Sequence, residues 1–208
     1  MGSAANQKLY AADPQYWSPG DIDKGQLCTY DAVTGSAHLE TITCDAPGDS
    51  QYCDPAGLAV SGDGHRLYIA TPDWLNPHPN PSFVIKDLVA DTQTVVVDNA
   101  FPDGFALSPD DTTLYVTGLA CNRIGVYDAR TGDHLYDVPM DGFTMGIDLS
   151  ADGKHLYVAQ TDTASYFQQS HTGESGFIRY VTDQVIYYYP CPPIVPKPRT
   201  LPTPVIAP

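Results

Sequence analysis

Basic residues are scarce in this 208-residue sequence: 10 Lys and Arg stand against 25 Asp and Glu, for a formal net charge of -15. Nucleic-acid binding needs a basic surface, so we expect no nucleic-acid partner. The acidic surplus also argues against adhesion to anionic membranes, although it is compatible with divalent cations. No apolar run approaches the roughly 20 residues of a membrane-spanning helix, so we expect no membrane insertion.

Several familiar signatures are missing as well. The five cysteines lack the close C-x₂₋₄-C pairs of a zinc site, and the sequence contains no Gly-x-Ser-x-Gly nucleophile elbow. Cys44 and Cys53 bracket a short loop that a disulfide could close, and buried free thiols are the alternative. A disulfide would indicate an oxidising compartment, which predicts an extracellular or periplasmic location. No signal region opens the chain, so residues 1–5 are expected to be an expression-derived or disordered start.

What the sequence does contain is a repeat. Three segments share one pattern of strand, acidic turn and strand, and they span residues 55–71, 101–118 and 144–160. Their glycines Gly57, Gly104 and Gly146 lie 47 and 42 residues apart, which is the period of a propeller blade. Because one hairpin cannot bury its apolar face alone, the repeats are expected to pack against each other.

The predicted fold is therefore all-β, a propeller-like repeat of four-stranded antiparallel blades over residues 6–189, with a plain β-sandwich as the alternative. Leu-Tyr pairs mark about four units, at Leu9, Leu67, Leu114 and Leu156. The first unit is expected to begin at its second strand, residues 8–12, as in a closed propeller whose last strand completes the first blade. Outer strands are expected over residues 37–43, 83–97 and 176–189.

Residues 190–208 differ in composition from the rest of the chain, since eight of these nineteen residues are proline. Proline lacks the backbone donor that a sheet interior needs, so this segment is predicted to be an extended, polyproline-like tail. It is expected either to be a flexible terminus or to dock on a neighbouring subunit as an assembly arm.

The run Pro-Asp-Gly-Phe-Ala-Leu-Ser-Pro-Asp-Asp-x-x-Leu-Tyr-Val at residues 102–116, followed by residues 122–132, resembles the gluconolactonase / senescence-marker-protein / strictosidine-synthase-like propellers. The resemblance covers about residues 8–160. It implies a six-bladed family in which a divalent cation in the axial channel polarises a lactone carbonyl. The ligand position that it implies, just before the motif glycine, holds Asp103 in one repeat but Ala56 and Met145 in the others.

Four acidic residues are candidate site residues. Asp103 is a candidate metal ligand or general base, and the alternative is a turn residue that accepts hydrogen bonds from backbone amides. Asp148 replaces the alanine of the other repeats at a position expected to be semi-buried, where a carboxylate needs a partner or a raised pKa. Asp21 and Asp23 have the spacing that opens a calcium loop, and an acidic surface turn is the alternative.

Two functional hypotheses follow, and the sequence leaves open whether the protein is an enzyme. The first is a hydrolase of small lactones or esters, or a degenerate relative of one, that depends on a divalent cation such as calcium or zinc. In that case Asp103 would be a ligand and the metal a Lewis acid. The second is a non-catalytic secreted propeller that binds or self-assembles, with another copy of itself as partner and the proline-rich tail as the subunit linker.

Overall fold

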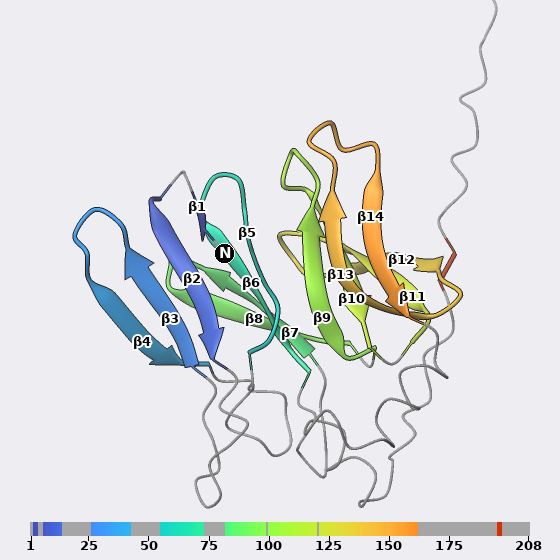
Figure 1. Cartoon of the computed structure of the whole chain (residues 1–208), viewed down its shortest axis with the longest axis horizontal. Helices are drawn as coiled ribbons and strands as arrows, with labels where there is room; N and C mark the ends of the chain where they lie inside the picture. The colour runs from blue at the N-terminus through green and yellow to red at the C-terminus, as the bar shows by residue number, and fades with distance from the viewer. Residues whose placement is uncertain are drawn as a thin grey trace, which may run out of the picture.

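The computed structural model describes residues 2–3, 6–13, 26–42, 55–72, 82–98, 100–119, 121–161 and 195–196, and these residues form strands and turns (Figure 1). The strands make four antiparallel sheets, which we call blades 1 to 4 in chain order. No helix in this part of the chain is long and apolar enough to cross a lipid bilayer.

Three of the blades have four strands each. Blade 1 comprises β1 (Gly2–Ser3), β2 (Lys8–Asp13), β3 (Gln26–Asp31) and β4 (Ala37–Thr41). Blade 2 comprises β5 (Leu58–Val60), β6 (Arg66–Thr71), β7 (Ser82–Asp87) and β8 (Thr92–Val97). Blade 3 comprises β9 (Pro102–Leu107), β10 (Thr113–Gly118), β11 (Arg123–Asp128) and β12 (His134–Pro139). Blade 4 is described for β13 (Phe143–Leu149) and β14 (Leu156–Thr161).

The predicted all-β, propeller-like repeat is confirmed, and most strands lie where the sequence predicts them. The outer strands expected over residues 37–43 and 83–97 are β4 and the pair β7 and β8. Residues 176–189 lie outside the described part of the chain. Blade 1 differs from the expectation, because the short strand β1 pairs with β2 and so fills the inner position at which no strand was predicted.

The turn inside each repeated hairpin is held by one serine and one aspartate. In blade 2 the Ser61 hydroxyl donates to Asp63 at 2.5 Å, and the same carboxylate accepts the His65 amide at 2.9 Å. Serine and aspartate repeat this contact in the next two hairpins, at 2.6 Å for Ser108 and 2.7 Å for Ser150. Short polar side chains that bond the nearby backbone favour a tight turn, which explains why the acidic turn recurs.

The turn between the third and fourth strands of a blade uses a second device. Asp31, Asp87 and Asp128 each accept the backbone amides two and three residues further on, at 2.8–2.9 Å. These amide donors hold the pKa of each carboxyl below its usual value. Both kinds of turn therefore depend on an aspartate that accepts hydrogen bonds from its near neighbours.

The core lies between the blades, so the sheet of blade 2, which has a neighbour on each side, is buried on both faces. On β6, Leu67 and Ile69 pack against blade 1, whereas Tyr68 and Ala70 pack against blade 3. The blade 1–2 cluster consists of Tyr10, Leu27, Ile42, Leu67, Ile69 and Val84. The blade 2–3 cluster consists of Ala59, Tyr68, Ala70, Phe83, Ile85, Phe105, Leu114, Val116, Tyr127 and Ala129. Each large apolar side chain buried in this way stabilises the fold by roughly 1.5–3 kcal/mol.

The innermost strands approach one another closely at two of the motif glycines, Gly57 and Gly104. A Cβ added to Gly57 would lie 1.7 Å from the carbonyl oxygen of Asp103 on β9. A Cβ added to Gly104 would lie 2.9 Å from the carbonyl oxygen of Met145 on β13. The three predicted hairpins are therefore neighbours along one row of inner strands, β5 to β9 to β13, which Figure 1 shows passing from blade 2 to blade 4.

We expect Gly57→Ala to destabilise the protein by about 1–3 kcal/mol or more, because the new methyl group would overlap backbone of the next blade. Gly146→Ala is the matched control, since a Cβ there would meet nothing within 4 Å. Urea unfolding of the two variants and the wild type measures the difference. Equal stability of the two variants would contradict this packing of the inner strands.

Candidate functional site

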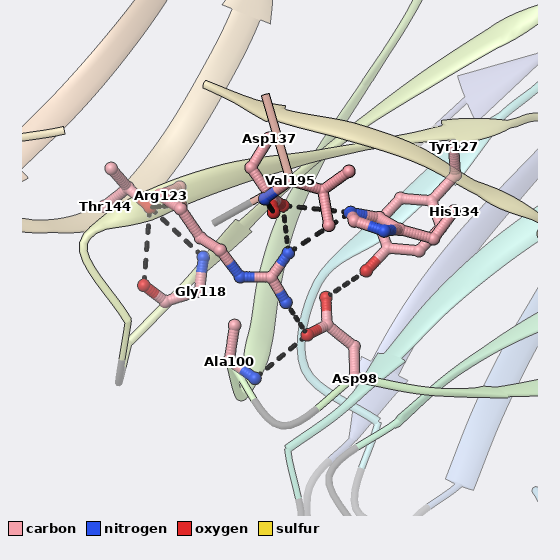
Figure 2. A network of polar contacts seen from close by, with 9 residues as sticks. All are labelled: Asp98, Ala100, Gly118, Arg123, Tyr127, His134, Asp137, Thr144 and Val195. Atoms are coloured by element: carbon pink, nitrogen blue, oxygen red, sulfur yellow. Dashed lines mark hydrogen bonds and ion pairs between the residues drawn. The ribbon is translucent and has the colours of Figure 1, made fainter. Parts of the chain in front are cut away.

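A buried ion network lies at one end of blade 3 (Figure 2). The Arg123 guanidinium, at the start of β11, contacts Asp98 through Nη2 at 2.5 Å and Asp137 of β12 through Nη1. The three side chains are only 1–4% exposed. Arg123 Nε has no hydrogen-bond partner among the described residues. If Arg123 and the two aspartates were separated, each would be a buried charge without a partner. The network therefore fixes the relative positions of the segments that carry these three residues.

Asp98 follows β8 and connects this network to the blade 2–3 core. Its Oδ2 accepts the Tyr127 hydroxyl at 2.6 Å, and its Oδ1 accepts the Ala100 amide at 2.9 Å. Burial, and then the charge and hydrogen bond of Asp98, raise the pKa of Tyr127 far above its usual value. Tyr127 is thus a neutral donor to the carboxylate that pairs with Arg123.

Asp137 binds a segment from the far end of the chain. Its backbone amide donates to the Val195 carbonyl oxygen at 2.6 Å, and its Oδ2 accepts the Val195 amide at 2.7 Å. The next residue, Pro196, forms an isolated parallel bridge with Asp137. Figure 2 shows Val195 next to Asp137, across the Arg123 guanidinium from Asp98. One residue of β12 therefore supplies both a donor and an acceptor to the backbone of the proline-rich tail.

The Asp137 carboxylate is held in place by its other contacts. Its Oδ1 lies 2.9 Å from His134 Nε2 and also accepts from Arg123. Burial alone would raise the pKa of Asp137, but the hydrogen bonds from Val195, Arg123 and His134 lower it below its usual value. The carboxylate is therefore ionised at neutral pH and already oriented toward the tail.

Blade 4 reaches the same region through Thr144 of β13. The Thr144 hydroxyl lies 3.2 Å from the Arg123 carbonyl oxygen, and it accepts the Gly118 amide at 3.2 Å. These contacts hold the backbone of Arg123 and Gly118 in place, and they do not involve the charged groups of the network. The network consequently joins the connection from blade 2, two strands of blade 3 and the inner strand of blade 4.

The sequence-predicted residue Asp103 lies elsewhere, on the inner strand β9. Its side chain is half-buried, and its carboxylate makes no hydrogen bond or ion pair within the described part of the chain. Burial raises the pKa of this carboxyl above its usual value. Among the described residues, no three His, Cys, Asp or Glu side chains lie close enough together to bind a metal ion. Within that part of the chain, Asp103 is therefore a single potential ligand and not part of a metal-binding cluster.

The other predicted residues are not brought to Asp103. Asp148 was expected to be semi-buried, and this prediction is wrong: it is exposed, because it lies on the face of blade 4 that points away from blade 3. Its Oδ1 accepts the Leu149 amide at 2.8 Å. Asp21 and Asp23 lie outside the described residues.

The cysteine prediction is open for a similar reason. Cys44 and Cys53, the two ends of the predicted disulfide, lie outside the described residues. Within the described part of the chain, Cys28 is a free thiol and Cys121 is disulfide-bonded. These observations do not test the predicted pair.

Sequence reasoning missed the buried network. The signal was present, because Arg123 begins the strand Arg-Ile-Gly-Val-Tyr-Asp, whose other residues before Asp128 carry no charge. A charged residue at the start of such a buried strand needs an acidic partner. The partners Asp98 and Asp137 could not be selected from the many aspartates, since only the folded chain brings them together.

Comparison with known proteins supports the fold. No protein-family model matches the chain. Antigen Lp49 of Leptospira interrogans is 28% identical over 109 residues, which are 50% of this chain and 24% of that protein. The chain thus spans about a quarter of the length of this curated relative. A β-propeller chain in a crystal structure of the mitotic checkpoint complex matches with a TM-score of 0.51 and 16% identity, over 64% of this chain and 37% of that one.

We expect Tyr127→Phe to destabilise the protein by about 1.5–3 kcal/mol, because the buried Asp98 carboxylate would lose a donor. Tyr68→Phe is the matched control: its hydroxyl is also buried but donates to a neutral carbonyl, that of Ala129, at 2.9 Å. Its loss should cost about 0.5–1.5 kcal/mol. Urea unfolding at neutral pH measures both values, and a larger effect of Tyr68→Phe would contradict the central place of the Tyr127–Asp98 contact in the network.

Proposed function

We propose that this chain is a binding and assembly module of the propeller class, whose outer edge at blade 3 binds an extended, proline-containing peptide. The observation that carries the proposal is the paired contact between Asp137 and Val195, in which one β12 residue engages both backbone groups of one tail residue. The occupant in the structure is the chain's own tail, and the tail of another copy offers the same chemistry.

The position of β12 supports this role. It is the last strand in the order β12-β11-β10-β9, so one side of its backbone is not paired within the sheet. Such an edge binds extended peptides by adding main-chain hydrogen bonds, which is a common mode of peptide recognition. A proline-rich peptide can offer few amide donors, and Val195 supplies one immediately before Pro196.

The prearranged carboxylate supports it further. Asp137 is buried and fixed by Arg123 and His134, so little side-chain freedom remains to be lost when the peptide binds. A hydrogen bond from an amide to a carboxylate is also stronger than one to a neutral acceptor. The site can therefore hold a peptide through a single residue, which suits a ligand interrupted by prolines.

We expect a chain ending at Cys191 to bind a labelled synthetic peptide of residues 192–208 in trans. Val195→Pro in the peptide removes the amide that Asp137 accepts and should weaken binding roughly tenfold to a hundredfold, the equivalent of about 1.5–3 kcal/mol. Val195→Ala keeps the amide and is the matched control. Fluorescence anisotropy measures the affinities, and equal affinity of the two variant peptides would contradict the proposal.

The same assay has a defined pH dependence. The pKa of Asp137 is lowered in the folded protein. Its contribution to peptide binding is therefore complete above the ordinary aspartate pKa of about 3.9, and it is lost as the pH falls through the lower pKa of the folded state. Peptide binding should accordingly be constant around neutral pH and weaken only in strong acid.

A second candidate is the divalent-metal-dependent lactone or ester hydrolase that the family resemblance implies. It is favoured by Asp103, because a half-buried carboxylate with a raised pKa is typical of functional sites. A cation bound there would relieve the unfavourable burial of its charge. The described residues supply no further ligand, so we propose a cation site at Asp103 without assigning steps of a reaction to it.

We expect Asp103→Asn to stabilise the metal-free protein at pH 7. Because the pKa of the Asp103 carboxyl is raised in the folded protein, the free energy of unfolding falls as the pH rises from about 3.9, the ordinary aspartate pKa, through this raised pKa. The neutral side chain of Asn does not ionise, so the variant does not lose this stability. Asp148→Asn removes an exposed charge and should change stability by less than about 0.5 kcal/mol.

Thermal melting with and without millimolar calcium or zinc tests the cation site itself. The wild type and Asp148→Asn should melt at higher temperature with the metal, whereas Asp103→Asn should not respond. A wild-type melting temperature that neither metal raises would contradict this second candidate.

A further inference from the structure

The three serine–aspartate hairpin turns share one backbone shape, and Asp111 stands where the other two turns have glycine. The fourth residue of each turn, Gly64, Asp111 or Gly153, has a positive φ of 73°, 56° or 70° and donates its amide to the carbonyl oxygen of the turn serine at 2.8–2.9 Å. This left-handed conformation suits glycine and is disfavoured for other residues, although aspartate tolerates it better than most. A residue held there in place of glycine points to a use for its side chain.

The Asp111 carboxylate reaches the turn of the preceding blade. Its Oδ1 and Oδ2 accept the amide of Gly62 at 3.0 and 2.8 Å, and Oδ2 also accepts the amide of Asp63 at 3.4 Å. Two consecutive amides that point at one anion form a backbone nest, which is an arrangement that binds anionic oxygens in proteins. The Asp63 carboxylate is engaged elsewhere, because it accepts the Ser61 hydroxyl and the His65 amide. The anion in this nest is therefore Asp111, from the next blade.

The next pair of turns lacks both halves of this contact. The turn position of Gly62 is held in blade 3 by Pro109, which has no amide hydrogen to donate. The turn position of Asp111 is held in blade 4 by Gly153, which has no carboxylate. These two residues still lie against each other, because a Cβ added to Gly153 would be 2.9 Å from Cδ and Cγ of Pro109. Donor and acceptor are thus present together between blades 2 and 3 and absent together between blades 3 and 4.

From these observations we propose that the amides of Gly62 and Asp63 form a carboxylate-binding site, which Asp111 fills from the neighbouring blade. Because Gly62 and Asp63 are exposed, their amides bind water when the Asp111 side chain is removed, and a small free carboxylate such as acetate can then take its place. Every residue of the site lies in blades 2 and 3. The inference goes beyond the proposed function and does not depend on the tail, so the two can fail separately.

The first test compares two aspartates that share the left-handed conformation. Asp111→Gly removes the bound carboxylate. Asp91→Gly is the matched control, because Asp91 has a φ of 53° and its exposed carboxylate lies 3.5 Å from Lys86 Nζ, an ion pair of little worth. Both variants relieve the same backbone strain, so Asp111→Gly should melt about 2–4 °C below Asp91→Gly through the loss of its charge-assisted hydrogen bonds. Equal melting temperatures would overturn the inference.

Acetate tests the binding site itself. The wild type, Asp111→Gly and Asp91→Gly are melted at neutral pH in sodium acetate and in sodium chloride of the same molar concentration. Asp111→Gly alone should melt about 1–2 °C higher in acetate than in chloride, because a ligand that binds only the folded state stabilises it. If acetate raises the melting temperature of all three proteins equally, or of none, the carboxylate-binding site is wrong.

A double-mutant cycle reproduces the contact between blades 3 and 4. Gly62→Pro removes the amide hydrogen, and Pro109 shows that this turn position accepts proline. A Cβ at residue 62 would also lie 3.1 Å from Asp111 Oδ2, so the carboxylate becomes unfavourable there. The change in melting temperature on Asp111→Gly should therefore be more favourable in the Gly62→Pro protein than in the wild type, by about 2–4 °C. An equal change in both proteins would overturn the pairing of Asp111 with the Gly62 amide.

Discussion

Burial of the central blades on both of their faces is the constraint on which this structure depends. β6 shows it most clearly: Leu67 contributes to the cluster with blade 1 and Tyr68 to the cluster with blade 3, and both are fully buried. A blade in this arrangement cannot complete its core by itself. Its stability therefore belongs to the interfaces with its neighbours, which is the general behaviour of repeat proteins.

The polar network at Arg123 adds positional specificity to this apolar packing. Hydrophobic faces alone would tolerate small shifts between blades, whereas a buried guanidinium must meet Asp98 and Asp137 together. Asp98 comes from the connection after blade 2, and Asp137 comes from the outer strand of blade 3. The same carboxylate that completes the network also accepts the amide of Val195, so tail binding is built onto a contact that the fold already requires.

Local features could be predicted from the sequence because their causes are local. The serine–aspartate contact of each hairpin turn needs only residues two positions apart, and the alternation of Leu67 and Ile69 with Tyr68 and Ala70 is visible in six residues. The environment of Asp148 could not be predicted, because the sequence does not show which face of β13 points away from blade 3. Nor could the partners of Arg123 be chosen, since residues 98, 123 and 137 meet only after three segments have folded.

Native-state hydrogen exchange tests the central claim most directly, because it reports how strand protection depends on the covering of each face. Packing by neighbours predicts that the amides of β6 and β10, which lie in sheets covered on both sides, exchange only through global unfolding. The outer strand β4, which carries the exposed Leu39, should exchange through smaller openings. Exchange of β6 amides as fast as those of β4 would contradict the account.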